Sequence, residues 1–315
     1  MKKISVVIPC FNEQDNIEYA YQEIKNALDR LPEYSWEMIF SDNDSTDLTQ
    51  EKLRSLCRKD KRVKAIFNLR NVGSDCNTMN GVLAATGDCA MCIACDLQEP
   101  PEMIVDMVRK WDQGEKLVWG QKSRTEDGFV MSFCRKAYYK LISHFAEIEQ
   151  YPNCIGFGIY DREIIEELRQ LNDPNPVLRN IVPNMGYKPF LITYEQRERK
   201  RGKSSYNFFR YCDLALNSAV HTTKTPMKFM IYFGVLCGLL SFCVGCYYLI
   251  RKLLFWDTFA LGLAPIIVSV TFISSIQIFL LGIMGEYILA ILDRVSFTKH
   301  VVEKERINFD REGKE

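Results

Sequence analysis

The chain has 315 residues, and its 40 lysines and arginines balance 40 aspartates and glutamates, so the formal net charge is zero. A protein that binds nucleic acid through its overall charge carries a basic excess, so no nucleic-acid partner is expected. The twelve cysteines are scattered through apparent strands and an apolar run. This distribution indicates small buried side chains in a reducing compartment rather than a disulfide framework.

Strand-like and helix-like patterns alternate over the first 120 residues. β-branched and apolar runs predict strands at residues 4–8, 36–40, 63–67, 89–94 and 117–120. Apolar side chains at helical spacing predict helices at residues 17–31, 48–56 and 77–85, and a further helix opened by Pro100 and Pro101. Repeated βα units of this length predict an α/β domain with a mostly parallel, Rossmann-like sheet and helices on both faces.

Polar side chains follow each of the first four expected strands. The loops read PCFNE at 9–13, SDNDSTD at 41–47, NLRNVG at 68–73 and DLQEPP at 96–101. Ligands of such folds bind beyond the carboxyl ends of the strands. Carboxylates and amides there could bind a nucleoside, and Asp96 with Gln98 could hold a hard divalent cation. The alternative is that these side chains only cap the helices that follow.

Cys89, Cys92 and Cys95 form two overlapping C-x-x-C spacings. Such spacing is compatible with a metal or redox site. No further pair of ligands lies nearby in the sequence, and alternation along a buried strand also accounts for the three cysteines. The strand interpretation is therefore favoured.

Two long runs without charged residues lie at 229–250 and 259–285. About 20 apolar residues in a helix span the hydrocarbon core of a bilayer, so the runs predict a transmembrane helical hairpin. The alternative is a pair of buried helices in a soluble core. Basic residues before and after the pair outnumber those in its connecting loop, which predicts that both ends face the cytoplasm.

The expected organisation has four parts. Residues 1–205 form a cytoplasmic domain, 206–227 a juxtamembrane amphipathic segment, 228–292 two transmembrane helices and 293–315 a cytoplasmic tail. The expected location is the cell inner (plasma) membrane, with a multi-pass topology.

The motifs IPCFNE, SDNDSTD, LRNVG and TGDCAMCIACDLQEPPE, followed by the apolar runs, resemble the family-two glycosyltransferases that act on polyprenyl phosphates. That family includes dolichol-phosphate mannose synthases and undecaprenyl-phosphate glucosyltransferases. The resemblance covers nearly the whole chain and implies a nucleotide-diphosphosugar transferase fold. It implies transfer of one monosaccharide from a UDP- or GDP-linked sugar to a polyprenyl (undecaprenyl) phosphate, with Mg²⁺ or Mn²⁺ as cofactor. It also implies a membrane partner, a cytoplasmic catalytic domain, and compatibility with a homo-oligomer.

The resemblance implies roles for individual residues. Asp96 is expected to be catalytic and to hold the metal together with Gln98. Nucleotide binding is expected at Pro9, Asn12, Glu13, Asp42, Arg70 and Gly73. The anionic acceptor phosphate itself requires cations, so its binding is expected at Arg124, Arg135, Arg199, Arg201 and Lys203. Arginine binds phosphate bidentately, whereas the alternative for the basic run 197–203 is an anchor at anionic headgroups.

The chain departs from the pattern of the family at three places. Asn43 and Ala94 stand where aspartates are common, and Ile155-Gly156-Phe157-Gly158 stands where Gly-Asp-Phe-Arg is common. Either the protein is a catalytically degenerate scaffold or regulator that retains the fold, or it has a leaner site and a different donor. A processive polysaccharide synthase is disfavoured, because the sequence contains no Gln-x-x-Arg-Trp motif and only two long apolar runs.

Overall fold

The computed structural model describes residues 1–123, 151, 153–171, 176–197, 232–234, 263–295 and 301–309, together with five single positions between 236 and 254. The chain divides into two compact units, each of which is described by itself. The first comprises Met1–Lys136, Ile148–Ser205 and Phe297–Glu315, and the second comprises Ala137–Glu147 and Tyr206–Ser296.

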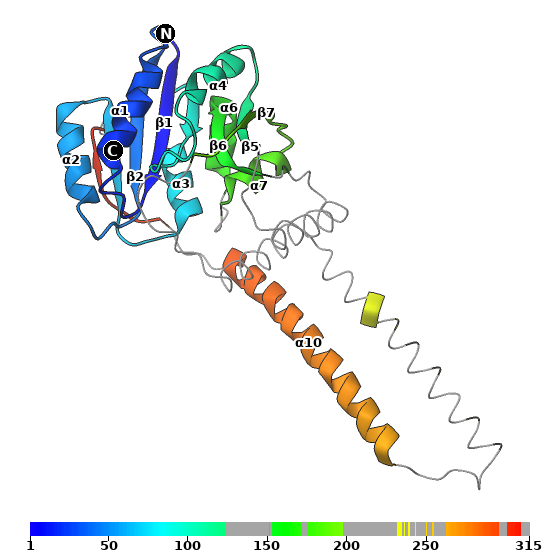
Figure 1. The fold of residues 1–315 in the computed structure, drawn as a ribbon. Helices are drawn as coiled ribbons and strands as arrows, with labels where there is room; N and C mark the ends of the chain where they lie inside the picture. Colours follow the sequence, from blue (N-terminus) through cyan, green and yellow to red (C-terminus); the bar gives the residue numbers. More distant parts are fainter. Residues whose placement is uncertain are drawn as a thin grey trace. The chain divides into compact units, whose positions relative to one another are not determined.

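An eight-stranded sheet forms the centre of the first unit, in the order β7-β5-β6-β4-β1-β2-β3-β8 (Figure 1). Its strands are β1 (Lys3–Cys10), β2 (Ser35–Asp42), β3 (Val63–Asn68), β4 (Cys89–Cys92), β5 (Leu117–Lys122), β6 (Cys154–Asp161), β7 (Phe190–Tyr194) and β8 (Glu303–Ile307). Strands β1 to β4 run parallel, and β5 is parallel to β7. Strands β6 and β8 are antiparallel to their neighbours. The expected mostly parallel α/β sheet is therefore confirmed.

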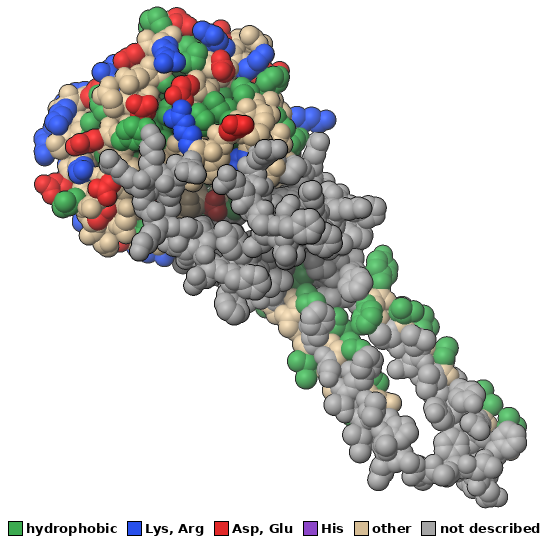
Figure 2. Space-filling view, viewed as in Figure 1, with side chains coloured by type: hydrophobic (Ala, Val, Ile, Leu, Met, Phe, Trp, Pro, Cys, Tyr) green, Lys and Arg blue, Asp and Glu red, His purple; other side chains and the backbone are tan. Residues whose placement is uncertain are grey.

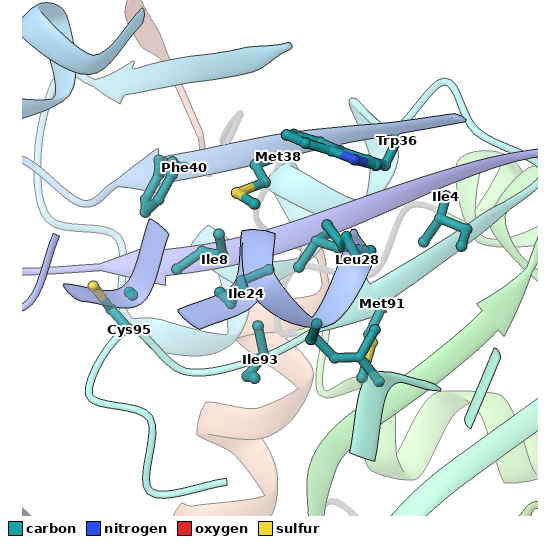
Figure 3. Packing of buried hydrophobic residues seen from close by; sticks show 14 of the residues in the cluster. Ile4, Ile8, Ile24, Leu28, Trp36, Met38, Phe40, Met91, Ile93 and Cys95 are labelled. Carbon is teal, nitrogen blue, oxygen red and sulfur yellow. The ribbon is translucent and has the colours of Figure 1, made fainter. Parts of the chain in front are cut away.

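Helices cover both faces of the sheet. On one face lie α1 (Ile17–Leu28), α2 (Thr49–Lys59) and α4 (Met103–Asp112), and on the other α3 (Ser74–Leu83), α6 (Arg162–Gln170) and α7 (Leu178–Asn184). Figure 3 shows Ile24 and Leu28 of α1 packed over Ile8 of β1. Because successive strand residues point to opposite faces, Val6 lies in this core and Val7 in the other. The result is a three-layer α/β/α unit.

The three clustered cysteines follow this alternation. Cys89 and Cys95 are buried in the core under α1, whereas Cys92 is buried in the core on the opposite face. The eight cysteines that the structure describes are all free, and seven of them are buried. Because the thiols lie on both sides of the sheet, they cannot share one metal ion. The strand interpretation of the C-x-x-C spacings therefore holds.

Surface charges of the first unit are mixed in sign. Figure 2 shows acidic and basic side chains interspersed over its visible face. Some form exposed ion pairs, such as Lys2 with Asp112 at 2.7 Å and Lys116 with Glu163 at 2.5 Å. Exposed pairs of this kind contribute little to stability.

The last described segment returns to the sheet as β8, beside β3. Glu305 pairs with Arg54 of α2 at 2.6 Å. The Asn308 side-chain amide donates to the carbonyl oxygens of Cys57 and Val63, at 2.7 Å each. The segment lies within residues 293–315, which were predicted to form a tail after the apolar runs. Its charged side chains are typical of an exposed edge strand.

The second unit contains α10 (Leu263–Val295). Within the part of the chain that the structure describes, no helix combines the length and the apolar character needed to cross a bilayer. The predicted multi-pass location in the inner membrane is therefore wrong. The helix contains residues 263–285 of the expected run 259–285 and continues over Glu286, Asp293 and Arg294 to Val295. Most of the other expected run, 229–250, lies outside the described residues.

Candidate active site at the carboxyl edge of the sheet

The loops after β1 and β2 hold each other at the carboxyl edge of the sheet. The Asn12 backbone N–H donates to Ser45 Oγ at 2.9 Å, and Asn12 Oδ1 accepts from the Thr46 N–H at 2.9 Å. The Glu13 N–H donates to Thr49 Oγ1 at 2.9 Å. Asn12 has a φ of +55°, a left-handed conformation that asparagine adopts more readily than most residues. The predicted Asn12 and Glu13 therefore lie beside the second loop.

Asp42 ends β2 and is fully buried at this edge. Its Oδ2 accepts from the Ser45 N–H at 3.2 Å and from Gln50 Nε2 at 2.8 Å. Its Oδ1 is buried and has no hydrogen-bond partner among the described residues. Burial raises the pKa of the carboxyl group, and the hydrogen bonds from Ser45 and Gln50 oppose that rise. A buried acceptor oxygen that lacks a hydrogen-bond partner favours a ligand that brings an N–H donor.

The loop after β3 lies beside the loop after β2. Asn43 Nδ2 donates to Asn71 Oδ1 at 3.0 Å, and Asn43 Oδ1 accepts from the Val72 N–H at 2.9 Å. Arg70 and Gly73 are exposed on this third loop. The structure therefore brings the three loops after β1, β2 and β3 to one edge of the sheet.

A tight turn after β4 presents Asp96 and Gln98. Leu97 is buried and has a φ of +51°, and its N–H donates to the Ala94 carbonyl at 3.2 Å. This left-handed residue leaves its neighbours Asp96 and Gln98 on the partly exposed side of the turn. The Gln98 N–H also donates to Asp96 Oδ1 at 3.4 Å. A left-handed leucine costs on the order of 1 kcal/mol, which burial of its side chain offsets.

The first and fourth loops meet around the Cys95 thiol. Burial raises the pKa of this thiol well above its ordinary range, and the nearby carboxylates of Glu13 and Asp96 raise it further. Figure 3 shows Cys95 close to the carboxyl end of β1. Glu13 and Asp96 are therefore neighbours at the same edge.

Glu99 is a buried acidic residue directly after the turn that carries Asp96 and Gln98. Its side chain is buried, with 2% of the residue exposed. Burial raises the pKa of Glu99, and the negative charge of Asp96 raises it further. Its Oε2 has no hydrogen-bond partner among the described residues. Glu99 is not among the site residues predicted from the sequence, although an acidic residue directly before Pro-Pro is a visible signal.

The segment after β7 comes back to the same turn. The Arg197 N–H donates to the Gln98 carbonyl at 3.0 Å, and Arg197 Nη2 lies 2.9 and 3.0 Å from the carboxylate oxygens of Glu102. The basic run 197–203 therefore begins beside Asp96 and Gln98. The predicted acceptor-binding residues themselves lie outside the described residues: Arg124, Arg135, Arg199, Arg201 and Lys203.

Comparison with known proteins decides the family. Residues 5–169 match the family model described as glycosyl transferase family 2. This chain belongs to glycosyl transferase family 2. It is 30% identical to the uncharacterized glycosyltransferase YkcC of Bacillus subtilis, over 92% of this chain and 89% of that protein. It is 28% identical to the bactoprenol glucosyl transferase of Shigella phage SfV, over 96% of this chain and 99% of that protein. The chain is a glycosyltransferase, as its motifs predict.

The solved structures that match this glycosyltransferase have lower sequence identity than the relatives named above. The mannosyltransferase PcManGT from Pyrobaculum calidifontis, in complex with GDP-Man and Mn²⁺, matches with 15% identity and a TM-score of 0.48, over 91% of this chain and 87% of that one. Glucosyl-3-phosphoglycerate synthase from Mycobacterium tuberculosis, in complex with Mn²⁺ and UDP, matches with 19% identity and a TM-score of 0.45, over 64% and 73% of the two chains.

The predicted site residues fall into two groups in this glycosyltransferase. Six lie on the three loops of the nucleotide side or at the strand end that leads into them: Pro9, Asn12, Glu13, Asp42, Arg70 and Gly73. Asp96 and Gln98 lie on the turn after β4. Their individual roles stay predictions. At the third departure from the family pattern, Gly156 has a φ of +91°, a backbone conformation that favours glycine over an acidic residue.

Proposed function

We propose that this glycosyltransferase moves one monosaccharide from a nucleoside diphosphate sugar, UDP- or GDP-linked, to a polyprenyl phosphate. Relatives named bactoprenol glucosyl transferase align with nearly the whole chain, and bactoprenol is a polyprenol. The observation that supports binding of the donor is Asp42 Oδ1, a buried oxygen without a partner among the described residues. It lies at the strand edge whose loops also carry Asp96. A nucleobase N–H would satisfy that buried oxygen.

The turn after β4 has the donor atoms that a divalent cation requires. Asp96 supplies a carboxylate and Gln98 an amide oxygen on one partly exposed side. Within the described residues, no group of three or more His, Cys, Asp or Glu side chains could hold a metal by itself. Mg²⁺ needs few protein ligands when substrate phosphates complete its shell, so the pair fits Mg²⁺ or Mn²⁺. Such an ion supplies charge neutralisation at the leaving nucleoside diphosphate.

The chemistry of the acceptor explains why a site with fewer carboxylates than is common in the family suffices. A phosphate monoester has a second pKa of about 6, so its attacking oxygen is largely ionised at neutral pH and needs no general base. The glycine at position 156 therefore removes no proton acceptor that the reaction requires. The acceptor does need cations, and Arg197 brings the start of the basic run to the turn that carries Gln98.

The first prediction tests the donor side. Asp96→Asn should lower turnover on the order of a hundredfold, because it removes the only charged member of the proposed cation pair while keeping its size. The assay is a panel of UDP- and GDP-sugars with Mg²⁺ and a short polyprenyl phosphate, read as new glycolipid by mass. Asp106→Asn, an exposed change on α4, is the matched control. Full activity of Asp96→Asn, or of the unmodified protein in excess chelator, would refute the assignment.

The second prediction tests the acceptor side. Alanine at Arg199, Arg201 or Lys203 should raise KM for the polyprenyl phosphate by about tenfold or more per residue, because each charge-assisted contact contributes roughly 1.5 to 3 kcal/mol. KM for the sugar nucleotide should change far less, since the strand-end loops hold the donor. Varying each substrate separately distinguishes the two. An unchanged acceptor KM would show that the basic run does not bind this substrate.

A further inference from the structure

The amide of Asn43 joins two loops of the donor edge. Its Nδ2 donates to Asn71 Oδ1 at 3.0 Å, and its Oδ1 accepts from the Val72 N–H at 2.9 Å. The same Asn71 Oδ1 accepts from the Gly73 N–H at 3.0 Å. Asn43 is 4% exposed, whereas Asn71 and Gly73 are exposed. A buried side chain of the second loop therefore fixes the backbone of the exposed third loop.

The bridge requires an amide at position 43. Backbone N–H groups only donate, so Val72 and Gly73 fix the orientation of both side-chain amides, with Asn71 presenting its oxygen. The remaining contact then joins the Asn43 nitrogen to that oxygen. A carboxylate at position 43 would place two oxygens about 3 Å apart there, which is repulsive. This contact gives a physical reason for asparagine where aspartate is common in the family.

We propose that Asn43 is a positioning residue that holds the loop 69–73 beside Asp42 to receive the nucleotide of the donor, an inference that rests on the proposed function. The loop has little packing of its own. Leu69 is 59% exposed, and a Cβ added at Gly73 would meet no described atom within 4 Å. Besides the Asn43 bridge, the Leu69 N–H donates to the Val302 carbonyl at 2.8 Å. Asn43 follows Asp42 in the chain, so the bridge connects the loop to the residue whose buried Oδ1 has no partner in the described part of the chain.

The test makes one chemical change at two neighbouring positions. Asn43→Asp removes the donor that the bridge needs, whereas Asn71→Asp keeps an acceptor oxygen and adds the same charge. Hydrogen exchange of the Val72 and Gly73 amides reports the bridge without any ligand. We expect faster exchange in Asn43→Asp and near-normal protection in Asn71→Asp. Asn26→Asp on the exposed side of α1 controls for an amide-to-acid change elsewhere.

Nucleotide binding then tests the role of the bridge. Calorimetric titration with UDP and with GDP, in Mg²⁺, should show about tenfold weaker binding for Asn43→Asp and a smaller loss for Asn71→Asp. In turnover assays, KM for the donor should rise more than kcat falls. Normal exchange in Asn43→Asp, or nucleotide binding equal to that of the unmodified protein, would overturn the inference alone. Failure of the unmodified protein to bind either nucleotide would overturn the proposed function and the inference with it.

Discussion

Glu37 is a buried carboxylate at the amino end of the sheet, away from the strand edge that carries the site. Its Oε2 lies 2.6 Å from Lys3 Nζ and 2.8 Å from Lys64 Nζ. Its Oε1 accepts from Ser5 Oγ at 2.6 Å and from the Thr86 N–H at 2.9 Å. Burial by itself would raise the pKa of Glu37, but these hydrogen bonds prevail and lower it to about 2.

This network predicts a defined acid sensitivity. The pKa of Glu37 falls from an ordinary 4.5 to about 2 on folding, which corresponds to about 3 kcal/mol of unfolding free energy. Because the folded pKa is the lower one, this contribution is present above about pH 4.5 and is lost as the pH falls towards 2. Glu37→Gln should therefore destabilise the protein at pH 7 by about 2 to 4 kcal/mol, and much less at pH 2.5.

Chemical unfolding at the two pH values checks this prediction. Glu33→Gln, on an exposed side chain, is the control for loss of one carboxylate. Some acid sensitivity should persist in Glu37→Gln, since hydrogen bonds from Arg62 also lower the pKa of Asp60 to about 2. An equal loss of stability for Glu37→Gln at both pH values would contradict the argument.

At the residue scale, sequence reasoning finds side chains whose position follows from local order. Asp42 and Asp96 can be found from the sequence, because Asp42 is the last residue of a buried apolar strand and Asp96 follows shortly after another. The left-handed turn at Leu97 and the burial of Glu99 depend on packing against distant strands, so no local pattern reveals them. The Asn43 bridge depends on the conformations of two loops at once. In the sequence it appears only as a departure from the family pattern.

At the element scale, the first four βα units lie close to their expected positions, because each has a clear period and a polar loop at its end. The later strands lack that signal. The sequence of β6 contains Gly156 and Gly158, and the exposed side chains of β8 are charged. The pairing of Ala65 with Ile307 joins distant parts of the sequence, so local periodicity cannot predict it.

The position of β8 has a physical basis at the same scale. Strand β3 is a buried parallel strand, and without β8 its outer edge would expose unpaired N–H and C=O groups. The strand β8 pairs with the backbone groups of that edge. Arg54 adds an ion pair with Glu305 and a cation–π contact 4.4 Å from the ring centre of Phe67. The charged side chains of β8 then form the outer edge and oppose further strand addition.

At the scale of the whole molecule, the unit that carries the site is discontinuous in sequence. Residues 297–315 belong to the same compact unit as the N-terminal strands, although residues 206–296 of the second unit lie between them in the chain. The sequence suggested a boundary near residue 205, since apolar runs follow it. A chain cut there would contain every proposed donor residue but would lack the strand that covers β3.

The last prediction follows from that discontinuity. A chain of residues 1–205 should be less stable and more prone to aggregate than residues 1–205 joined by a flexible linker of about 20 residues to 297–315, because only the second covers the edge of β3. Chemical unfolding and size-exclusion chromatography of both chains measure the difference. The matched control carries the same linker with residues 301–309 in scrambled order, and it should behave like the shorter chain. If all three chains proved equally stable and monomeric, β8 would be a passive addition to the sheet, and residues 1–205 would fold as an independent domain.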